Sequence, residues 1–387
     1  MISRTSTGKL LVALLVPLTA VVPLLFILAF STSQPALADD RESITIRWKS
    51  PVTQPVCLAM STGGKFFGSV DRDGTVRFYD QNGDLLWEQQ VEGATDVLIA
   101  KNGESLLVYS KLNPVYQDVH FFRKDGSRLW EHRVEGSVWS GAISVDGTRA
   151  AVSTGERYIY VYRPDPMRPR YRRWRTDGIG YQVTFTADNK HVIVGTWQES
   201  GLACYDLDGR FQWRSRYDTD RQYQLHASAD GKTMLGLLPA TQHDPGIEVW
   251  FRDSGGKVLW QQSLDGFDAR ARVSPQSQYV AISYAKFLAE ADPNMIERKV
   301  AVYGSDGHIL WEKGGLFFGP RLVALSPKGS SVIVSDGERS LYNMDKRGKI
   351  LSKLTLGGTV RSTVSSEDGQ RILLYCGDGW LYLISVG

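Results

Sequence analysis

A short phrase recurs along this 387-residue chain: a polar turn that closes on Gly, three further residues, and then Trp. The first copy runs from Asp80 to Trp87, and a copy without the Gly ends at Trp174. The other pairs are Gly126 and Trp130, Gly209 and Trp213, Gly256 and Trp260, and Gly307 and Trp311. Counted from Trp48, successive Trp residues of this series lie 39 to 51 positions apart. That period is typical of propeller blades, so we expect a closed ring of repeated units.

A second phrase precedes each Trp phrase and consists of two apolar segments joined by a polar turn, often with a Ser before the turn. Asp-Gly and Asn-Gly turns between short β-rich segments are signals of hairpins. Eight copies occur, at 59–67, 99–107, 143–147, 185–189, 227–231, 273–277, 325–329 and 365–369. Each repeat therefore supplies two hairpins, which make one four-stranded antiparallel blade. The predicted fold class is all-β, an eight-bladed β-propeller.

The eighth unit lacks one strand, and an isolated strand near the N-terminus matches that deficit. Segments 372–375 and 380–385 read as strands, but no Trp-bearing outer strand follows them. Residues 44–48 form a strand that ends on Trp48 and belongs to no other unit. We expect this N-terminal strand to be the outer strand of the last blade and to close the ring. One propeller domain is thus predicted over residues 39–387.

Residues 1–38 have the three parts of an export signal. Arg4 and Lys9 precede an uncharged apolar run at 10–30, and a small-residue site ends at Ala38, before Asp39. Cleavage between Ala38 and Asp39 is one expectation. The 21-residue run is also long enough to span a bilayer as an uncleaved anchor, the only membrane contact that we expect. Both alternatives place the body outside the cytoplasm, in the periplasm or at the cell surface.

Charge and cysteine content exclude several classes of function. The chain has 45 Lys and Arg against 42 Asp and Glu; without Arg4 and Lys9 the balance is 43 against 42. Such a balance argues against wholesale binding of nucleic acid or of an anionic membrane surface. Cys57, Cys204 and Cys376 have no metal-ligand spacing. Cys57 and Cys376 would fall in adjoining blades, where either a disulfide or two small buried side chains is expected.

No motif for catalysis or for metal binding stands out. The six His residues show no metal-ligand spacing, and no arrangement typical of a Ser-His-Asp triad or of paired catalytic carboxylates is found. The Asp-x-Asp-Gly turns resemble calcium loops only in part, because an EF-hand loop needs Gly at its sixth position and a carboxylate at its twelfth. We therefore assign no catalytic residue and no metal ligand from the sequence.

The combined repeat, an apolar-Ser-Pro-x-Gly turn as at 325–329 followed by Asp-x-x-Gly-x-x-x-Trp as at 80–87, resembles the pyrroloquinoline-quinone-like and WD-like propeller repeats of exported prokaryotic proteins. The resemblance covers nearly everything after residue 43. Its superfamily includes quinoprotein alcohol dehydrogenases and the propeller lipoprotein of the outer-membrane β-barrel assembly machinery. This chain has neither a Cys between Phe30 and Asp39 for lipid attachment nor the adjacent Cys pair of the quinoproteins.

Candidate binding residues lie where the inner strands of the blades are predicted to start. In a four-stranded meander, the loops between the second and third strands share one face of the ring with the links between blades. The longer loops, at 111–118, 198–201, 240–246 and 286–297, all belong to that face, a pattern of binding faces in repeat proteins. The channel-mouth candidates are Asp96, Trp139, Tyr181, Gln182, Tyr223, Gln224, Arg270, Arg321 and Arg361. They are expected either to contact a partner or to fill the channel and meet water.

A basic segment forms the second candidate surface. Between residues 163 and 175 it contains Tyr171, Trp174 and a run of arginines, of which the candidates are Arg168, Arg170, Arg172, Arg173 and Arg175. Guanidinium groups in such a run suit phosphates, anionic lipids or an acidic partner. A solvated basic edge that discourages strand-to-strand aggregation is the alternative interpretation.

The function expected from these observations is that of an exported, non-enzymatic scaffold, a monomeric disc that binds a protein of the cell envelope or membrane and needs no cofactor. The alternative is a quinoprotein-type oxidoreductase that holds pyrroloquinoline quinone with calcium in the channel. A third possibility is a propeller that cleaves sugars or polyphenols.

Overall fold

A computed structural model describes residues 43–163, 170–197, 201–216, 224–228, 230–238, 240, 246–287, 296–314, 321–326 and 331–387. Residues 39–387 form one compact unit. The predicted leader at 1–38, with its cleavage or anchoring, lies outside the described residues and stays a prediction. No helix in the described ranges is long and apolar enough to cross a membrane.

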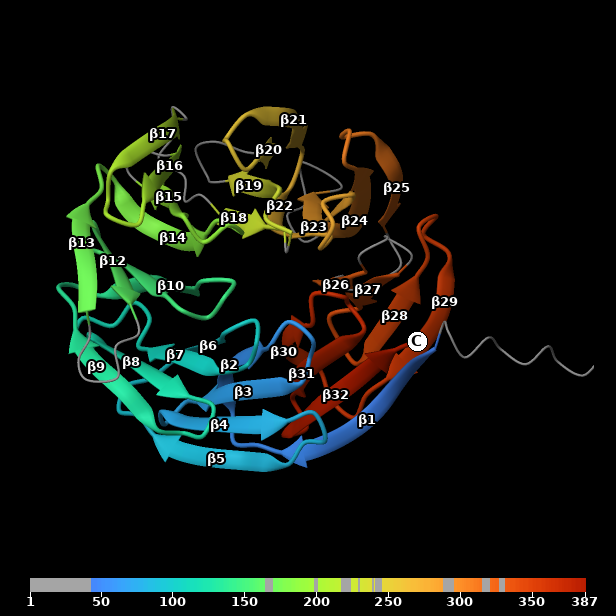
Figure 1. Ribbon diagram of the computed structural model, residues 1–387. Helices are drawn as coiled ribbons and strands as arrows, with labels where there is room; N and C mark the ends of the chain where they lie inside the picture. The colour runs from blue at the N-terminus through green and yellow to red at the C-terminus, as the bar shows by residue number, and fades with distance from the viewer. Residues whose placement is uncertain are drawn as a thin grey trace, which may run out of the picture. The chain divides into compact units, whose positions relative to one another are not determined.

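The regular secondary structure of the described residues consists of strands, which form eight antiparallel sheets of four strands each (Figure 1). Blade 1 consists of β2 (Pro55–Met60), β3 (Phe66–Asp71), β4 (Thr75–Asp80) and β5 (Leu85–Gln90), and blade 2 of β6 (Asp96–Ile99), β7 (Ser105–Tyr109), β8 (Asp118–Arg123) and β9 (Arg128–Arg133). Blade 3 consists of β10 (Val138–Ile143), β11 (Ala150–Thr154), β12 (Tyr158–Arg163) and β13 (Arg170–Arg175), and blade 4 of β14 (Ile179–Phe185), β15 (His191–Trp197), β16 (Gly201–Asp206) and β17 (Phe211–Arg216).

Blade 5 consists of β18 (Gln224–Ala227), β19 (Thr233–Leu238), β20 (Ile247–Asp253) and β21 (Val258–Leu264), and blade 6 of β22 (Phe267–Val273), β23 (Tyr279–Phe287), β24 (Ile296–Gly304) and β25 (Ile309–Gly314). Blade 7 consists of β26 (Arg321–Leu325), β27 (Val332–Ser335), β28 (Ser340–Met344) and β29 (Ile350–Thr355). Blade 8 completes the ring with β30 (Val360–Ser365), β31 (Arg371–Cys376) and β32 (Trp380–Val386), and its fourth strand is β1 (Ile44–Pro51). The first strand of each blade is innermost, and each inner strand contacts the next one, with β30 contacting β2.

The predicted closure is confirmed. Strand β1 pairs antiparallel with β32, from Ile44 opposite Val386 to Pro51 opposite Trp380. The N-terminal strand therefore supplies the outer strand of the last blade, and the two ends of the propeller are joined by backbone hydrogen bonds. The predicted fold, eight blades of four strands closed by an N-terminal strand, is the fold observed.

The recurring Gly and Trp meet across blade boundaries. The indole of one blade lies against the turn glycine of the next, which has a positive φ: the pairs are Trp48 with Gly83, Trp87 with Gly126, Trp174 with Gly209, Trp213 with Gly256, Trp260 with Gly307, and Trp311 with Gly348. A Cβ on Gly307, for example, would lie 2.8 Å from Cγ of Trp260. Glycine is thus required for two reasons: the backbone adopts a left-handed conformation, and the indole leaves no room for a side chain.

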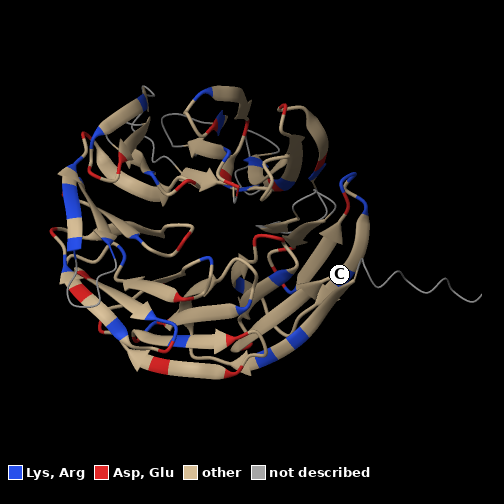
Figure 2. Ribbon diagram, in the orientation of Figure 1, with Lys and Arg blue, Asp and Glu red and all other residues tan. Residues whose placement is uncertain are grey.

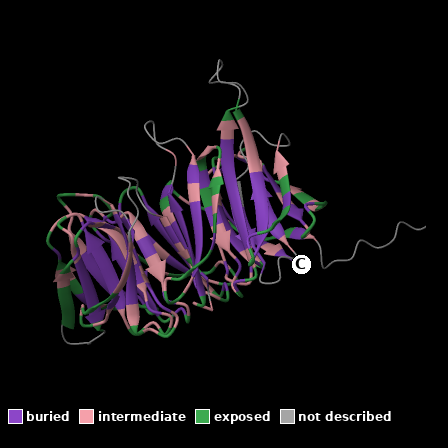
Figure 3. Ribbon diagram, turned by 90° about the horizontal axis from the view of Figure 1, so that it is seen from above, coloured by how far each residue is buried: buried purple, intermediate pink, exposed green. Residues whose placement is uncertain are grey.

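Burial follows the same layered order. Apolar side chains of the inner and middle strands form the clusters between blades, and the outer strands expose one side to water (Figure 3). The three cysteines are free thiols, so Cys57 and Cys376 are not bridged in this structure. Burial raises the pKa of the Cys57 thiol to about 11 and that of Cys376 to about 12, which suits small apolar side chains.

Strand β1 offers a test of closure with its own control. Ile44 is 7% exposed and packs in the core between the last two blades, whereas Ile46 on the same strand is 42% exposed. We expect Ile44→Ala to lower the free energy of unfolding by about 2–4 kcal/mol, because the buried position loses packing and leaves a cavity. Ile46→Ala should cost about 0.5 kcal/mol or less. Urea unfolding of both variants measures the difference, and equal costs would contradict closure by β1.

Candidate functional site

The candidate site lies on the face of the propeller where the innermost strands begin, here called the loop face. Eight of the channel-mouth candidates that the sequence suggested fall within the first four residues of innermost strands. Those candidates are Asp96, Trp139, Tyr181, Gln182, Gln224, Arg270, Arg321 and Arg361. Tyr223 lies outside the described residues. The loops between second and third strands open on the same face, because all the blades are meanders of the same order.

Three aromatic side chains form a cluster at this mouth. The ring of Trp139 lies 5.9 Å from that of Tyr181 and 5.6 Å from that of Trp197, measured between centroids. All three are only partly buried, although they come from the innermost strands β10 and β14 and from the end of β15. Trp197 was missed by the sequence reasoning. Its position directly before the insertion at 198–201 is the signal that could have pointed to it.

Two of the polar candidates on the mouth, Gln182 and Asp96, already form hydrogen bonds within the protein. The amide of Gln182 donates to the backbone oxygen of Leu225 and accepts from its N–H, both at 2.7 Å. It therefore links the inner strands of blades 4 and 5. Asp96 accepts a hydrogen bond of 3.2 Å from Thr95. Burial raises the pKa of the Asp96 carboxyl, and nearby Lys111 and that hydrogen bond oppose the rise.

Gln224, Arg270 and Arg361 are brought together in a cavity of about 400 Å³ inside the loop-face half of the channel. The cavity also reaches Arg272 and His226, which the sequence reasoning missed. Alternation along a strand could have found Arg272, since side chains two positions apart point to the same side of a sheet. Nε2 of His226 is fully buried and has no hydrogen-bond partner in the described part of the chain. Burial, with a smaller contribution from Arg272, lowers the pKa of His226 to about 3.

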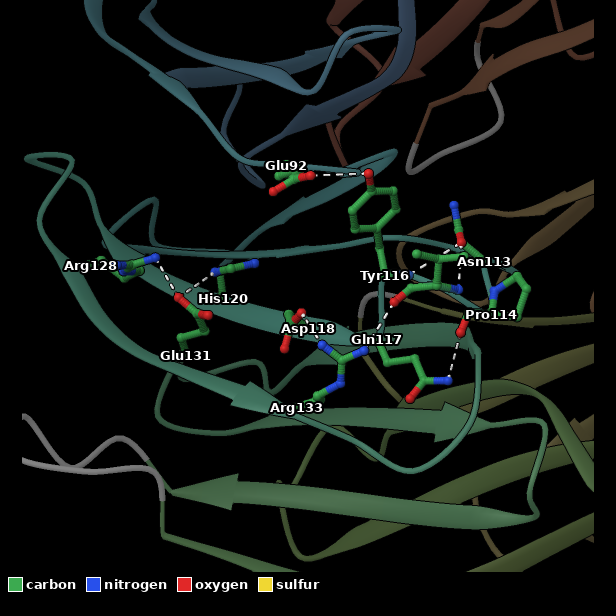
Figure 4. A network of polar contacts seen from close by, with 11 residues as sticks. Glu92, Asn113, Pro114, Tyr116, Gln117, Asp118, His120, Arg128, Glu131 and Arg133 are labelled. Carbon is green, nitrogen blue, oxygen red and sulfur yellow. Dashed lines mark hydrogen bonds and ion pairs between the residues drawn. The ribbon is translucent and has the colours of Figure 1, made fainter.

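One long loop of the loop face is held in place by polar contacts (Figure 4). In the segment after β7, Asn113 accepts hydrogen bonds from the backbone N–H of Val115 at 2.9 Å and of Tyr116 at 3.3 Å. The Tyr116 hydroxyl contacts Glu92 at 3.1 Å, and Arg133 donates to the backbone oxygen of Val115 at 3.1 Å. These contacts hold the loop in a defined shape.

Exposed apolar side chains gather on the same face. Leu112 and Val115 on this loop are 52% and 64% exposed. Phe287 and Ile296, at the end of the long β23–β24 hairpin, are 49% and 41% exposed. Phe287 stacks on Phe267 at the start of β22, with 4.5 Å between ring centroids.

The basic segment lies on β13, the outer strand of blade 3, where Figure 2 shows a run of basic residues. Arg172 pairs with Asp208 of blade 4 at 3.4 Å, and Arg173 pairs with Glu135 before blade 3. Arg173 and Arg175 also lie over the ring of Tyr158, at 4.5 Å and 5.8 Å. Arg170 is exposed on the same strand, whereas Arg168 lies outside the described residues. Much of the charge on this strand therefore serves contacts with neighbouring elements.

Among the described residues, those that line the loop-face cavity do not offer the ligands of a calcium-bound quinone. Calcium takes six to eight oxygen ligands, several of them carboxylates. Asp268 is the carboxylate lining the loop-face cavity, and it pairs with Arg298 at 2.7 Å. In the ranges that the structure describes, no three His, Cys, Asp or Glu side chains lie together in a way that could hold a metal ion.

Fold and repeat together define the class: this is an eight-bladed β-propeller whose repeats resemble the pyrroloquinoline-quinone-like type, as the sequence predicted. Residues 115–282 match the family model described as "Outer membrane protein assembly factor BamB", a match that covers less than half of the chain. No curated protein sequence matches the chain.

Solved structures share the architecture at low sequence identity. A structure titled "Structure of Dos1 propeller" matches at 16% identity and a TM-score of 0.68, covering 89% of this chain and 96% of the other. BamB from Moraxella catarrhalis matches at 14% identity and a TM-score of 0.62, over 89% and 100%. The hydrazine synthase of Kuenenia stuttgartiensis matches at 15% and 0.57, over 88% and 97%. At such identities the likeness establishes the fold alone, and function must be argued from the site.

His226 makes the stability of the protein depend on pH. Its pKa is about 3 in the folded protein, against about 6.5 in an unfolded chain, so the unfolded chain binds the proton more readily. The free energy of unfolding should therefore fall as the pH drops from about 6.5 toward 3. His226→Gln should reduce this slope, measured by urea unfolding between pH 7 and pH 4. It should not abolish the slope, because burial also lowers the pKa of His120 and His132.

His308→Gln changes an exposed histidine and should keep the wild-type slope. Equal slopes for the wild type and His226→Gln would contradict the assignment of His226 as a histidine that is buried in its neutral form.

Proposed function

We propose that this protein is an extracytoplasmic scaffold that binds a protein of the cell envelope through its loop face. The observation that carries the proposal is the cluster of Trp139, Tyr181 and Trp197 at the channel mouth. Trp, Tyr and Arg are the residue types that dominate the binding energy of protein interfaces. Rings held on strands of the propeller are already positioned, so little conformational entropy is lost when a partner covers them.

The surroundings of the cluster support the same conclusion. Val115 and Phe287 are apolar side chains at least 49% exposed on elements that stand around the mouth. The polar contacts of Asn113 and Tyr116 hold the first of these elements in shape. A protein partner that covered this face would remove apolar surface from water at both points and would contact the aromatic cluster between them.

The proposed export is inferred from the sequence, and the proposed type of partner is inferred from the similarity to a known protein family. The charged and apolar segments of residues 1–38 have the order of an export signal. The partial match to the family model named for an outer-membrane assembly factor favours a role beside other envelope proteins. The leader, cleaved or retained, places the propeller on the side of the membrane where such partners are found.

Capture of partners from crosslinked cells tests the proposal. Wild-type protein, expressed in its native host and crosslinked mildly, should recover an envelope protein in stoichiometric amount. Trp139→Ala and Tyr181→Ala should each reduce the recovered partner about tenfold or more, because truncation of a central aromatic contact weakens an interface strongly.

Phe211→Ala is the matched control, since Phe211 is a 55% exposed aromatic residue on the outer strand β17. Its partner yield should equal that of the wild type, and thermal unfolding of all three variants checks that they are folded. Equal yields from the Trp139, Tyr181 and Phe211 variants would refute the loop face as the docking surface.

A further inference from the structure

The channel contains two cavities that share one arginine as a lining residue. The loop-face cavity, about 400 Å³, is lined by the innermost strands β18, β22 and β30 and by Ser335 at the end of β27. The second cavity, about 330 Å³, is lined mostly by residues at or beyond the ends of the innermost strands. Arg272 lines both cavities. Arg272 therefore lies between the loop-face cavity and the second cavity.

The loop-face cavity has an excess of positive charge. Arg270 and Arg272 project from one strand at alternate positions, and Arg361 comes from β30. In the part of the chain that the structure describes, none of these three guanidinium groups forms an ion pair. The acid that lines the cavity, Asp268, is already paired with Arg298 at 2.7 Å.

The second cavity differs, because its charges are largely balanced. Lys101 and Glu367 line it and pair with each other at 2.6 Å. Of the described residues that line this cavity, Arg272 is the remaining cation. The unbalanced charge of the channel thus belongs to its loop-face half.

Arg272 lacks the partner that its position calls for. It is half-buried, and its described hydrogen bond is a contact of 3.0 Å to the backbone oxygen of the adjacent Ala271. Burial and the neighbouring Arg270 lower the pKa of Arg272, yet a guanidinium group keeps its proton in proteins. A charge that is withdrawn from water and unpaired costs free energy, which a bound anion would recover.

Neutral donors complete the cavity. Gln224, Ser362 and Thr363, whose side chains can donate hydrogen bonds, are among the residues that line it. The buried Nε2 of His226 has no partner among the described residues and becomes a donor in one tautomer of the ring. Guanidinium groups and neutral hydrogen-bond donors suit carboxylate oxygens, which accept several hydrogen bonds at once.

We propose that this cavity receives the carboxylate side chains of an acidic segment of the partner protein, with Arg270 and Arg361 at the mouth and Arg272 at the base. The inference rests on the proposed scaffold function and names the chemistry of the segment that the scaffold holds. Arg270 and Arg361 are exposed and lie on the same face as the aromatic cluster. A segment that enters the mouth is therefore continuous with a partner docked on the loop face, and its successive carboxylates meet cations at two depths.

Titration of hexaglutamate into the full chain, purified in mild detergent, tests the site directly by calorimetry. We expect the wild type to bind the peptide and the double variant Arg270→Gln/Arg361→Gln to bind at least about tenfold more weakly, because two charge-assisted contacts are lost. Both residues are exposed, so the substitutions leave the core intact.

The matched control is Arg123→Gln/Arg347→Gln, which removes the same charge from exposed positions next to the turns between the third and fourth strands. It should bind hexaglutamate about as well as the wild type. An equal loss in both double variants would show diffuse attraction and overturn the site. Binding of inorganic phosphate or pyrroloquinoline quinone without binding of hexaglutamate would overturn the acidic segment as its occupant.

Partner capture separates this inference from the scaffold proposal. If the partner is lost in Trp139→Ala and also in Arg270→Gln/Arg361→Gln, both proposals stand. If the arginine double variant keeps the partner while Trp139→Ala loses it, the scaffold stands and the acidic-segment inference fails. If neither variant loses the partner, the loop face is not the docking surface.

Discussion

The indole of an outer-strand Trp, packed against the turn glycine of the next blade, is the contact on which the ring depends. Trp260 shows its parts: the ring stacks on Phe251 of its own blade and on Tyr303 of the next, at 5.2 and 5.8 Å, and its N–H donates to the backbone oxygen of Ser305 at 3.1 Å. Gly307 leaves room for this ring because it has no side chain. The same contact recurs in the six Trp–Gly pairs named above, so the blades that they connect are joined at the rim as well as through their apolar faces, and β1 supplies one of these contacts, Trp48 against Gly83.

A ring joined in this way holds its innermost strands at fixed positions, and the candidate site is a consequence of that arrangement. Trp139 and Tyr181 come from adjacent blades and meet because β10 and β14 are neighbours. Arg270 and Arg361 are 91 positions apart in the chain but line one cavity. None of these groups depends on a mobile element for its placement. A partner that docks on the loop face therefore contacts a surface that is already ordered. Most of the conformational entropy lost on binding is then lost by the partner.

Most of the fold was predictable from the sequence, and much of the site was not. The Gly–Trp period and the Asp-Gly turns specify blades because every copy repeats the same local physics, and the missing outer strand identified Ile44–Trp48 as its replacement. Site residues occur once each and follow no period. The mouth candidates were located by strand order alone, which cannot tell that Gln182 is bound to Leu225. The basic segment was found from its composition, which cannot tell that Arg172 is paired with Asp208. Trp197, His226 and Arg272 become site candidates only through contacts and cavities that they share with residues of other blades.

A double-mutant cycle between Trp260 and Gly307 tests the central claim that the repeat encodes contacts between blades. The reference is Gly379→Ala, since Gly379 has a φ of 85° but no atom within 4 Å of an added Cβ, whereas Gly307 has a φ of 82° and Trp260 at 2.8 Å. We predict that Gly307→Ala lowers the free energy of unfolding by about 1–3 kcal/mol more than Gly379→Ala, through overpacking. In a Trp260→Ala background this excess should disappear, because the added methyl then has room. An equal cost of Gly307→Ala in both backgrounds would mean that the glycine serves only its own turn, and the account of the ring would be wrong.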